Sequence, residues 1–459
     1  MLKKKILVIL SSEYYNKYFN LNSFQKLDKK YDLIFALKKK IFKKKNKFKL
    51  YKLDRNNKYI IRYLKLIKLR SLRKIPSLYT SLQFSFPSYK TYKSLFFQKD
   101  HKFPFLFYIK NYFFINILFK ILSNFPFFQF YKKFLFLKIK NKSEIDTLIE
   151  NIKPDLIIYP THFMEPEMIY INRSALINNS KTFYIVDNWD NLTTKVAMLQ
   201  KANYLGVWGQ QSKEHAIKYH NYNSKNIFLL GNNRINKYFQ FRKKKYKNTI
   251  KINKPYILFL GSNLLPREEL KCLKILDKKI DENNLNSKLK IIYRFHPQLS
   301  KYIRMEFTNI KFKNIKINIP SSKLALTDRN LVRSKTQSKD YFPLIQNAKS
   351  LMGLTITTVT LEGFIFGKNY IILDCIDKED AHISNFLKKY SEHPKGIEKI
   401  KICKIVKTYE EFFRFIKKNN KKVDQKKIDK QLNFFYYNQS TDYQLKIKQC
   451  VDKIFSKDF

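Results

Sequence analysis

Short apolar runs alternate with longer amphipathic stretches along most of this chain, a rhythm typical of α/β proteins with parallel sheets. We expect strands at residues 6–10, 31–37, 156–159, 182–186, 204–208, 227–230, 256–260, 289–294, 315–317, 351–356 and 370–373. Helices are expected at 143–152, from Pro266 onward, at 341–348 and from about Val359. In a parallel sheet the carboxyl ends of the strands share one edge, where α/β proteins bind ligands.

The rhythm is interrupted at residues 38–142, where lysine runs are mixed with aromatic residues. Within this insertion, Lys110 and Lys120 break the apolar stretch 103–138 into pieces shorter than the roughly 18 residues that a membrane-spanning helix needs. Two interpretations remain open. The segment forms a helix that lies in a membrane interface, or it is a helical insertion packed on its own domain.

The length of 459 residues allows two or three domains. A lysine- and asparagine-rich linker, 243–254, separates two βα series. We therefore expect an N-terminal acceptor-side domain at 1–245, a donor-binding domain at 246–404, and a basic helical tail at 405–459.

The formal net charge of +56 raises the question of nucleic acid. Lysine is spread along the whole chain and arginine, the usual reader of bases, is far less frequent, so we expect no nucleic-acid partner. The charge instead favours an anionic membrane surface and anionic substrates such as nucleotides.

The four cysteines, Cys272, Cys375, Cys403 and Cys450, are too far apart for a disulfide framework or a zinc site. The apolar run near the N-terminus is too short for a signal peptide. We expect no metal and a cytoplasmic protein, peripheral on the inner face of a bacterial plasma membrane.

The stretch 350–368 predicts a strand, a threonine loop and a helix. Backbone N–H groups, threonine hydroxyls and the helix dipole would together form an anion pocket. We place Thr357, Thr358 and Thr360 at the phosphate of a donor and Glu362, in the first helical turn, at a ribose diol. The alternative is that the threonines cap the helix and Glu362 favours its dipole.

Other polar residues follow the neighbouring strands of the same series. Arg294 and His296 follow one strand, and Gly261 and Ser262 follow another. They supply a cation, an imidazole and small-residue N–H groups, the parts needed to bind a diphosphate. For His296, which precedes Pro297, the alternative is an ordinary loop turn.

Three motifs, YRFHPQ, TITTVTLEG followed by FGK, and DNWDNLTTK, resemble those of bacterial surface-carbohydrate transferases of the GT-B fold. The groups closest in pattern are the CDP-glycerol glycerophosphotransferases, the capsule-type glycosyltransferases and the His-Pro sialyltransferases. The resemblance covers roughly 154–373 and implies two Rossmann-like domains facing a cleft. It implies that His296, Thr357 and Thr358 hold the donor's phosphates and that Glu362 holds its ribose. The insertion at 38–142 departs from the pattern.

The DNWDN motif places Asp187, Trp189, Asp190 and Asn191 after a strand of the first domain, on the acceptor side. An inverting transfer needs a general base, for which Asp190, Asp187 and His162 are the candidates. The alternative for the motif is a turn that caps the next helix.

We expect a glycosyltransferase that uses a CMP-, CDP- or UDP-activated donor and a glycan or lipid-linked acceptor, with no cofactor. The alternatives, in order, are a CDP-glycerol-type glycerophosphotransferase, a nucleotide-sugar 2-epimerase, and a non-enzymatic basic protein that binds membrane or RNA.

Overall fold

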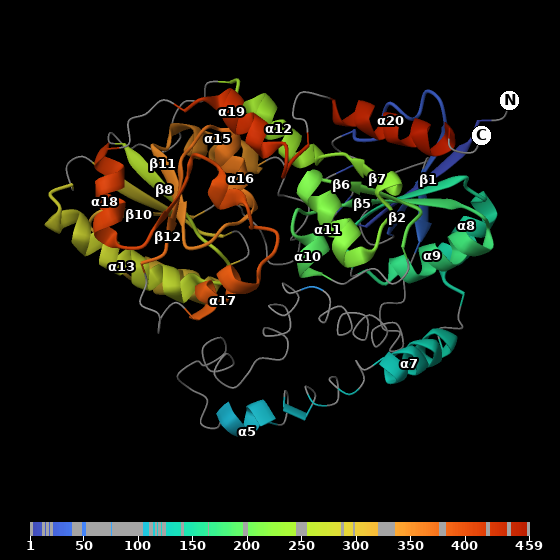
Figure 1. Cartoon of the computed structure of the whole chain (residues 1–459), viewed down its shortest axis with the longest axis horizontal. Helices are drawn as coiled ribbons and strands as arrows, with labels where there is room; N and C mark the ends of the chain where they lie inside the picture. Colours follow the sequence, from blue (N-terminus) through green and yellow to red (C-terminus); the bar gives the residue numbers. More distant parts are fainter. Residues whose placement is uncertain are drawn as a thin grey trace. The chain divides into compact units, whose positions relative to one another are not determined.

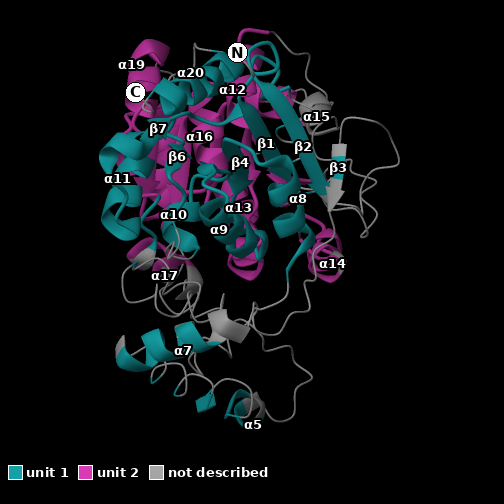
Figure 2. Ribbon diagram, turned by 90° about the vertical axis from the view of Figure 1, so that its right-hand side faces the viewer, with its two compact units in different colours: residues 1–233, 390–393, 435–459 teal, residues 234–389, 394–434 magenta. Residues whose placement is uncertain are grey.

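The computed structural model describes residues 3–11, 14, 18, 22–38, 48–51, 75, 104–109, 113–114, 117, 121, 125–138, 142–163, 165–195, 201–244, 255–285, 289–296, 299–319, 336–375, 382–418, 423–437 and 442–456. The chain divides into two compact units (Figure 2). Unit 1 comprises residues 1–233, 390–393 and 435–459, and unit 2 comprises 234–389 and 394–434. Residues 405–459 are thus divided between the two units.

Unit 1 contains a seven-stranded parallel sheet in the order β3-β2-β1-β4-β5-β6-β7. Its strands are β1 (Lys5–Leu10), β2 (Asp32–Lys38), β3 (Phe48–Tyr51), β4 (Leu156–Thr161), β5 (Lys181–Val186), β6 (Tyr204–Val207) and β7 (Ile227–Leu229). Strands β1, β4, β5 and β6 are largely buried apolar runs, as expected for a parallel sheet covered on both faces, whereas β2 is only partly buried.

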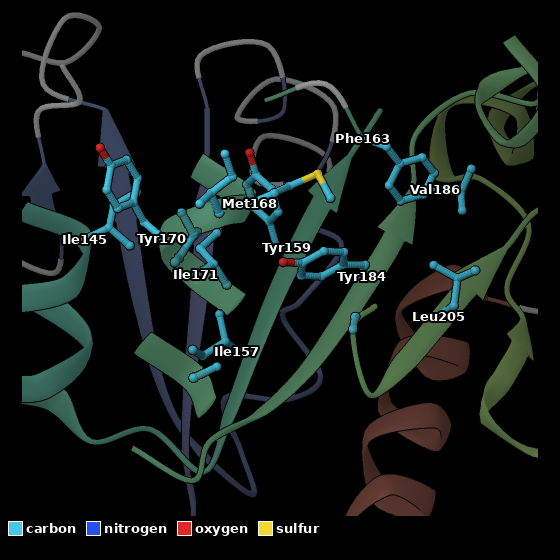
Figure 3. Close-up of a cluster of buried hydrophobic side chains, with 14 of the residues drawn as sticks. Ile145, Ile157, Tyr159, Phe163, Met168, Tyr170, Ile171, Tyr184, Val186 and Leu205 are labelled. Atoms are coloured by element: carbon cyan, nitrogen blue, oxygen red, sulfur yellow. The ribbon is translucent and has the colours of Figure 1, made fainter. Parts of the chain in front are cut away.

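Alternate residues of each strand feed two separate cores. Leu7 and Ile9 of β1 join one core with α8 (Glu144–Ile152) and α9 (Glu167–Ile177), shown in Figure 3. Ile6 and Val8 join the other with α20 (Tyr443–Ser456), which lies against the sheet in Figure 1. In the described part of unit 1 the other helices are α5 (Pro104–Tyr108), α7 (Phe125–Lys138), α10 (Asn191–Thr194), α11 (Gln210–His220) and the 3₁₀ turn η3 (Ser224–Asn226). Successive side chains of a strand point to opposite faces of the sheet, which explains why each strand contributes to both cores.

Unit 2 contains a six-stranded parallel sheet in the order β10-β9-β8-β11-β12-β13. Its strands are β8 (Tyr256–Leu260), β9 (Lys290–Arg294), β10 (Ile315–Asn318), β11 (Ser350–Gly353), β12 (Tyr370–Leu373) and β13 (Cys403–Val406). Its helices are α13 (Pro266–Glu282), α14 (Lys301–Thr308), α15 (Thr336–Asn347), α16 (Thr358–Ile365), α17 (His382–Tyr390), α18 (Tyr409–Lys418), α19 (Gln425–Leu432) and the 3₁₀ turn η4 (Ile397–Lys399). Helix α12 (Asn233–Phe241) begins at the boundary between the units.

The two faces of the unit 2 sheet are covered by different helices. Ile257 and Phe259 of β8 pack in a core with α13, α14 and α18. Tyr256 points to the other face, where its hydroxyl donates a 2.8 Å hydrogen bond to the carbonyl of Leu344 in α15. The two units are therefore both Rossmann-like α/β domains, which confirms the fold class predicted from the sequence.

Three local predictions need correction. Strand β3 lies inside the segment we assigned to the insertion, and β13 was not predicted. We expected the strand before the threonine loop to reach 356, but β11 ends at Gly353. The reason is that the Thr355 carbonyl accepts a 3.1 Å hydrogen bond from the Tyr370 hydroxyl and leaves the strand ladder.

Within the insertion, the described segments α5 and α7 are helical. Most of residues 52–103 and the linker residues 245–254 lie outside the described part of the chain. In that described part, none of the helices is long and apolar enough to cross a membrane.

Candidate functional site

The strand order of unit 2 changes direction between β8 and β11, since later strands are added on opposite sides of them. In open parallel sheets, ligands bind outside the carboxyl ends of the strands at such a switch point. Gly261 and Ser262 follow β8, Arg294 and His296 lie at the end of the adjacent β9, and the threonine loop follows β11. The structure therefore gathers the predicted donor residues at one sheet edge.

The loop after β8 is fixed by the buried carboxyl group of Glu269. Glu269 of α13 accepts hydrogen bonds from the backbone N–H of Ser262 at 2.7 Å and from the Tyr293 hydroxyl at 2.6 Å. A Cβ at Gly261 would lie 2.7 Å from the Tyr293 hydroxyl oxygen and 3.0 Å from the Arg294 carbonyl. Glycine is thus required there by close packing, and the Ser262 N–H is engaged within the protein.

Burial raises the pKa of Glu269 to about 8, and the neighbouring Glu268 adds to the shift. The hydrogen bonds from Tyr293 and Ser262 act in the opposite direction but do not cancel it. Glu269 is therefore a largely protonated side chain at neutral pH, placed directly behind the loop.

The threonine loop forms the cap of α16. Thr357 donates its backbone N–H to the hydroxyl of Thr360 at 3.1 Å, and the N–H of Thr360 donates to the Thr357 carbonyl at 2.9 Å. Thr360 is fully buried, whereas Thr357 and Thr358 are half-buried. The side chains of Thr357 and Thr360 together form a capping box, and Thr358 is the first residue of the helix.

Glu362 lies in the second turn of α16, not in the first turn as we predicted. It is 5 % exposed, and it accepts a 2.8 Å hydrogen bond from the Tyr341 hydroxyl on α15. Tyr238 of α12 also hydrogen-bonds to it, and Arg234 of the same helix is close enough to attract its charge. The interpretation of Glu362 as a mere dipole partner therefore loses its basis, since that effect falls off after the first turn.

Burial raises the pKa of Glu362 above its usual value, while Arg234 and the hydroxyls of Tyr341 and Tyr238 oppose that shift. Arg294 lies with its guanidinium carbon 5.3 Å from the centre of the Tyr341 ring and donates a 2.5 Å hydrogen bond to the Asn318 side chain. The two arginines and two tyrosines thus form one cluster with the carboxylate.

The sequence analysis missed Arg234, Tyr238 and Tyr341. Arg234 stands in the polar run GNNRIN after an expected strand, which was the available signal. Nothing in the sequence distinguishes Tyr238 and Tyr341 from the many other aromatic residues of this chain.

His296 follows β9 and is half-buried. Its carbonyl accepts a 3.0 Å hydrogen bond from the N–H of Leu299. Pro297 lies outside the described residues. His296 follows β9 at the same sheet edge as the threonine loop.

In unit 1, the DNWDN residues occupy different environments. Trp189 is buried, with its indole N–H donating to Gln211 at 2.9 Å and its ring 4.9 Å from that of His393. Asp190 accepts a 2.7 Å hydrogen bond from the Thr194 hydroxyl. Asn191 is fully buried and accepts the N–H of Asn188 at 2.8 Å.

Asp187, 2 % exposed, follows β5, and its carbonyl accepts a 2.9 Å hydrogen bond from Asn232. His162 follows β4, with Nδ1 3.1 Å from Glu165 Oε2. Glu165 was not predicted from the sequence, although the polar run THFMEPE after the expected strand 156–159 contains it. Among the described residues, no three metal-binding side chains are grouped as a metal site.

Comparisons with known proteins support the fold. No family model and no curated protein matches the chain. A Listeria monocytogenes protein provisionally assigned as a UDP-N-acetylglucosamine 2-epimerase is 12% identical over 99% of this chain and 97% of its own, with a TM-score of 0.53. Another UDP-N-acetylglucosamine 2-epimerase is 12% identical over 99% and 96%, with a TM-score of 0.50.

A glycosyltransferase from Rickettsia africae ESF-5 is 10% identical over 99% of both chains, with a TM-score of 0.49. At such identities the first two structures show a shared fold alone, that of two Rossmann-like domains of the GT-B class.

Proposed function

We propose that this chain is a GT-B glycosyltransferase that moves a sugar from a nucleotide-activated donor to a surface polysaccharide or a lipid-linked acceptor. The observation that carries the proposal is the switch-point edge of unit 2. There Arg294 and His296 after β9 share one edge with the threonine loop and Glu362 after β11.

Unit 2 would bind the donor. The N-terminus of α16, with the hydroxyls of Thr357 and Thr358, would receive the phosphates, since helix N-termini and small polar residues favour anions. His296 would donate to a phosphate oxygen. Glu362 would accept the ribose hydroxyls, because a carboxylate has about four acceptor positions and can keep its tyrosine partners.

The transfer needs no cofactor in this proposal. When the bond between sugar and phosphate breaks, the negative charge grows on the leaving phosphate. Fixed dipoles and cations at the sheet edge stabilise such a charge, in a way that often makes the largest catalytic contribution.

Unit 1 would hold the acceptor and supply the general base, for which Asp187, Asp190 and His162 are the candidates. Trp189 and Asn191, expected on the acceptor side, are both buried. We therefore assign them the indirect role of fixing the loop after β5, on which Asp187 and Asp190 stand.

The acceptor class follows from α7 and the charge of the chain. Phe127, Phe130 and Phe134 of α7 are 53%, 74% and 41% exposed and recur at helical spacing on one face. Together with the excess of lysine, this face suits an anionic membrane. We propose a peripheral protein on the inner face of a bacterial plasma membrane, acting on a lipid-linked glycan.

A nucleotide-sugar 2-epimerase is the second candidate, because solved structures with the same fold carry that name. It differs from a transferase in one measurable way. An epimerase converts UDP-N-acetylglucosamine to its 2-epimer without any acceptor, whereas a transferase releases free nucleotide. A CDP-glycerol-type glycerophosphotransferase would instead release CMP from CDP-glycerol.

The first experiment is a thermal-shift screen of the whole chain with CMP, CDP, UDP and GDP, followed by calorimetry with the tightest binder. Stabilisation grows with ligand concentration relative to Kd, so a real site gives a concentration-dependent rise in Tm. Equal shifts with inorganic phosphate would indicate nonspecific attraction to the basic chain. The absence of any nucleotide effect at millimolar concentration would refute the donor site.

A further inference from the structure

Unit 1 has its own switch point, between β1 and β4. Tyr14 follows β1, while Thr161 ends β4 and His162 and Glu165 follow it. The Tyr14 hydroxyl donates a 2.5 Å hydrogen bond to Glu165 Oε1 and so joins the two loops across the switch point. This is the position where an open parallel sheet binds its ligand.

Glu165 is surrounded by hydrogen-bond donors. Its Oε2 accepts a hydrogen bond from the Thr161 hydroxyl at 2.7 Å and lies 3.1 Å from Nδ1 of the His162 ring. Its Oε1 accepts a hydrogen bond from the backbone N–H of His162 at 3.2 Å. Burial by itself raises the pKa of Glu165, but the bonds from His162, Tyr14 and Thr161 outweigh burial and hold the pKa below its usual value. Glu165 is therefore a buried carboxylate at neutral pH.

The carboxylate determines the tautomer of the imidazole. An ionised carboxylate only accepts hydrogen bonds, so His162 Nδ1 must carry a hydrogen. In the neutral ring the basic nitrogen is then Nε2, on the side of the ring away from Glu165. The His162 side chain is 32% exposed, compared with 10% for that of Glu165. A base oriented by a buried third group is the arrangement that activates hydroxyl nucleophiles in many enzymes.

The two rival carboxylates have less suitable surroundings. Asp187 is 2% exposed, and its charge acts on the buried Tyr14. Asp190 precedes α10, and its carboxylate holds the Thr194 hydroxyl as part of that turn. Asp187 is thus almost fully buried and the Asp190 carboxylate serves a turn, whereas the His162 side chain is about one third exposed and its Nδ1 lies 3.1 Å from a buried carboxylate.

We propose that His162 is the general base of unit 1 and that Glu165 is its positioning residue, with an acceptor hydroxyl as the substrate group. This rests on the proposed transferase function. His162 Nε2 takes the proton as the hydroxyl oxygen forms a bond to the anomeric carbon of the donor. The bond from that carbon to phosphate oxygen breaks, and the electron pair leaves with the nucleotide. Glu165 stabilises the imidazolium that results.

Nucleotide binding separates this inference from the function on which it rests. Calorimetry with the nucleotide found by the screen should give the same Kd, within about twofold, for the wild type, His162→Ala and Glu165→Gln. If the wild type binds no nucleotide, the transferase proposal fails. If the wild type binds nucleotide but the turnover of the variants and the tautomer of His162 contradict the proposal, only the assignment of the general base fails.

Turnover is measured as nucleotide released from UDP-N-acetylglucosamine, CMP-N-acetylneuraminic acid or CDP-glycerol, with water or a mixture of simple sugars as acceptor. His162→Ala should lower kcat by about 10²- to 10⁴-fold, the usual contribution of a general base. Glu165→Gln should lower kcat by about tenfold or more without raising KM for the donor. The control Glu214→Gln, at an exposed glutamate of α11 in the same unit, should stay within about threefold of the wild type. Full turnover in His162→Ala, with loss in Asp190→Asn or Asp187→Asn, would overturn the assignment.

The tautomer of His162 is measured without substrate and therefore tests the orientation of the base even where no donor turns over. The chain has 7 histidines, so long-range ¹H–¹⁵N spectra are tractable, and His162→Ala assigns the signal. We expect the Nδ1–H tautomer in the neutral ring. An Nε2–H tautomer would place the basic nitrogen toward Glu165 and would overturn the proposal.

Discussion

The hydroxyl of Tyr341 donates a 2.8 Å hydrogen bond to Oε2 of Glu362, which joins α15 to α16 at the carboxyl edge of the unit 2 sheet. The carboxylate proposed to receive a ribose is therefore already held by the protein. A pre-oriented acceptor loses less entropy when a ligand binds, because its rotamer is fixed beforehand. A carboxylate held in this way would suit the proposed role of binding a ribose.

Single substitutions at Glu362 and at His296 should separate recognition of the ribose from recognition of the phosphate. Glu362→Gln keeps the shape but removes the charge, and it should weaken a nucleoside and its nucleotide alike by roughly 1.5–3 kcal/mol, the range for hydrogen bonds to charged groups. His296→Ala should weaken the nucleotide by a similar amount and spare the nucleoside. Calorimetry of each variant with both ligands makes the comparison.

The matched control is Glu306→Gln, an exposed glutamate of α14 in the same unit, which should change neither affinity. Unchanged affinities in both test variants would mean that the site is elsewhere. From the sequence alone we predict little effect of Glu362→Gln on stability, because the residue was expected near a strand end, in the first turn of a helix and outside the core. Its burial now predicts a measurable change in the free energy of unfolding.

Most strands were predictable because buried parallel strands are continuous apolar runs with polar ends. The expected bounds of β8 and β12 agree with the structure, and Pro266 begins α13 as predicted. Strand β3 escaped notice since FKLY is four residues long and lies among lysines, at the edge of its sheet. At an edge, neighbouring strands impose less of the apolar pattern on the sequence.

The candidate site was predictable where side chains follow strand ends and unpredictable where they come from helices. Arg294 and His296 were found through the end of β9. Tyr238 and Tyr341 reach Glu362 from α12 and α15. Those helices meet through tertiary packing, for which no local pattern in the sequence exists.

Glu269 should make stability depend on pH. Its pKa is raised in the folded state to about 8 from the ordinary 4.5. A raised carboxyl pKa contributes stability that is complete below pH 4.5 and is lost as pH rises through 8, at up to about 1.4 kcal/mol per pH unit for one group. Glu269→Gln mimics the protonated form and should remove this slope. Urea unfolding of both proteins at pH 6 and pH 9 measures it.

In that experiment the wild type should lose more stability than Glu269→Gln between the two pH values. Glu362, whose pKa is also raised, contributes a slope of the same sign to both proteins, so a residual slope is expected. Equal slopes would show that Glu269 is ionised in the folded protein at pH 6.

Substitutions at Gly353 and Tyr370 should have non-additive effects on the free energy of unfolding. A Cβ at Gly353 would lie 2.5 Å from the Tyr370 hydroxyl oxygen, and its next contacts are at an ordinary 3.5 Å. Gly353→Ala should therefore cost about 1–3 kcal/mol of stability, as overpacking does. Tyr370→Phe, which loses the hydrogen bond to the Thr355 carbonyl, should cost about 0.5–1.5 kcal/mol.

In the double variant the clash is gone, so the total cost should be smaller than the sum of the two single costs by at least about 1 kcal/mol. Denaturant unfolding of the four proteins completes the cycle. Additive costs would show that Tyr370 moves away from an alanine at no expense.

Helix α7 should bind anionic membranes through one of its two faces. Phe128 is 2% exposed and packs in the unit 1 core, with Tyr131 against it. Phe127 and Phe130, on the other face, are 53% and 74% exposed. Packing on the domain and membrane binding, which we had treated as alternatives, thus fall on different sides of the same helix.

We expect the protein to float with vesicles that contain phosphatidylserine or phosphatidylglycerol, and binding should weaken as salt is raised, because lysines supply part of the attraction. Phe127→Ala with Phe130→Ala should reduce binding severalfold and leave unfolding unchanged. Phe128→Ala is the matched control. It removes an equal ring from the buried face, so it should lower stability by about 3–5 kcal/mol while the folded fraction still binds vesicles. If the variant with Phe127→Ala and Phe130→Ala floats as well as the wild type, the lysines alone attract the membrane and the exposed aromatic face does not bind it.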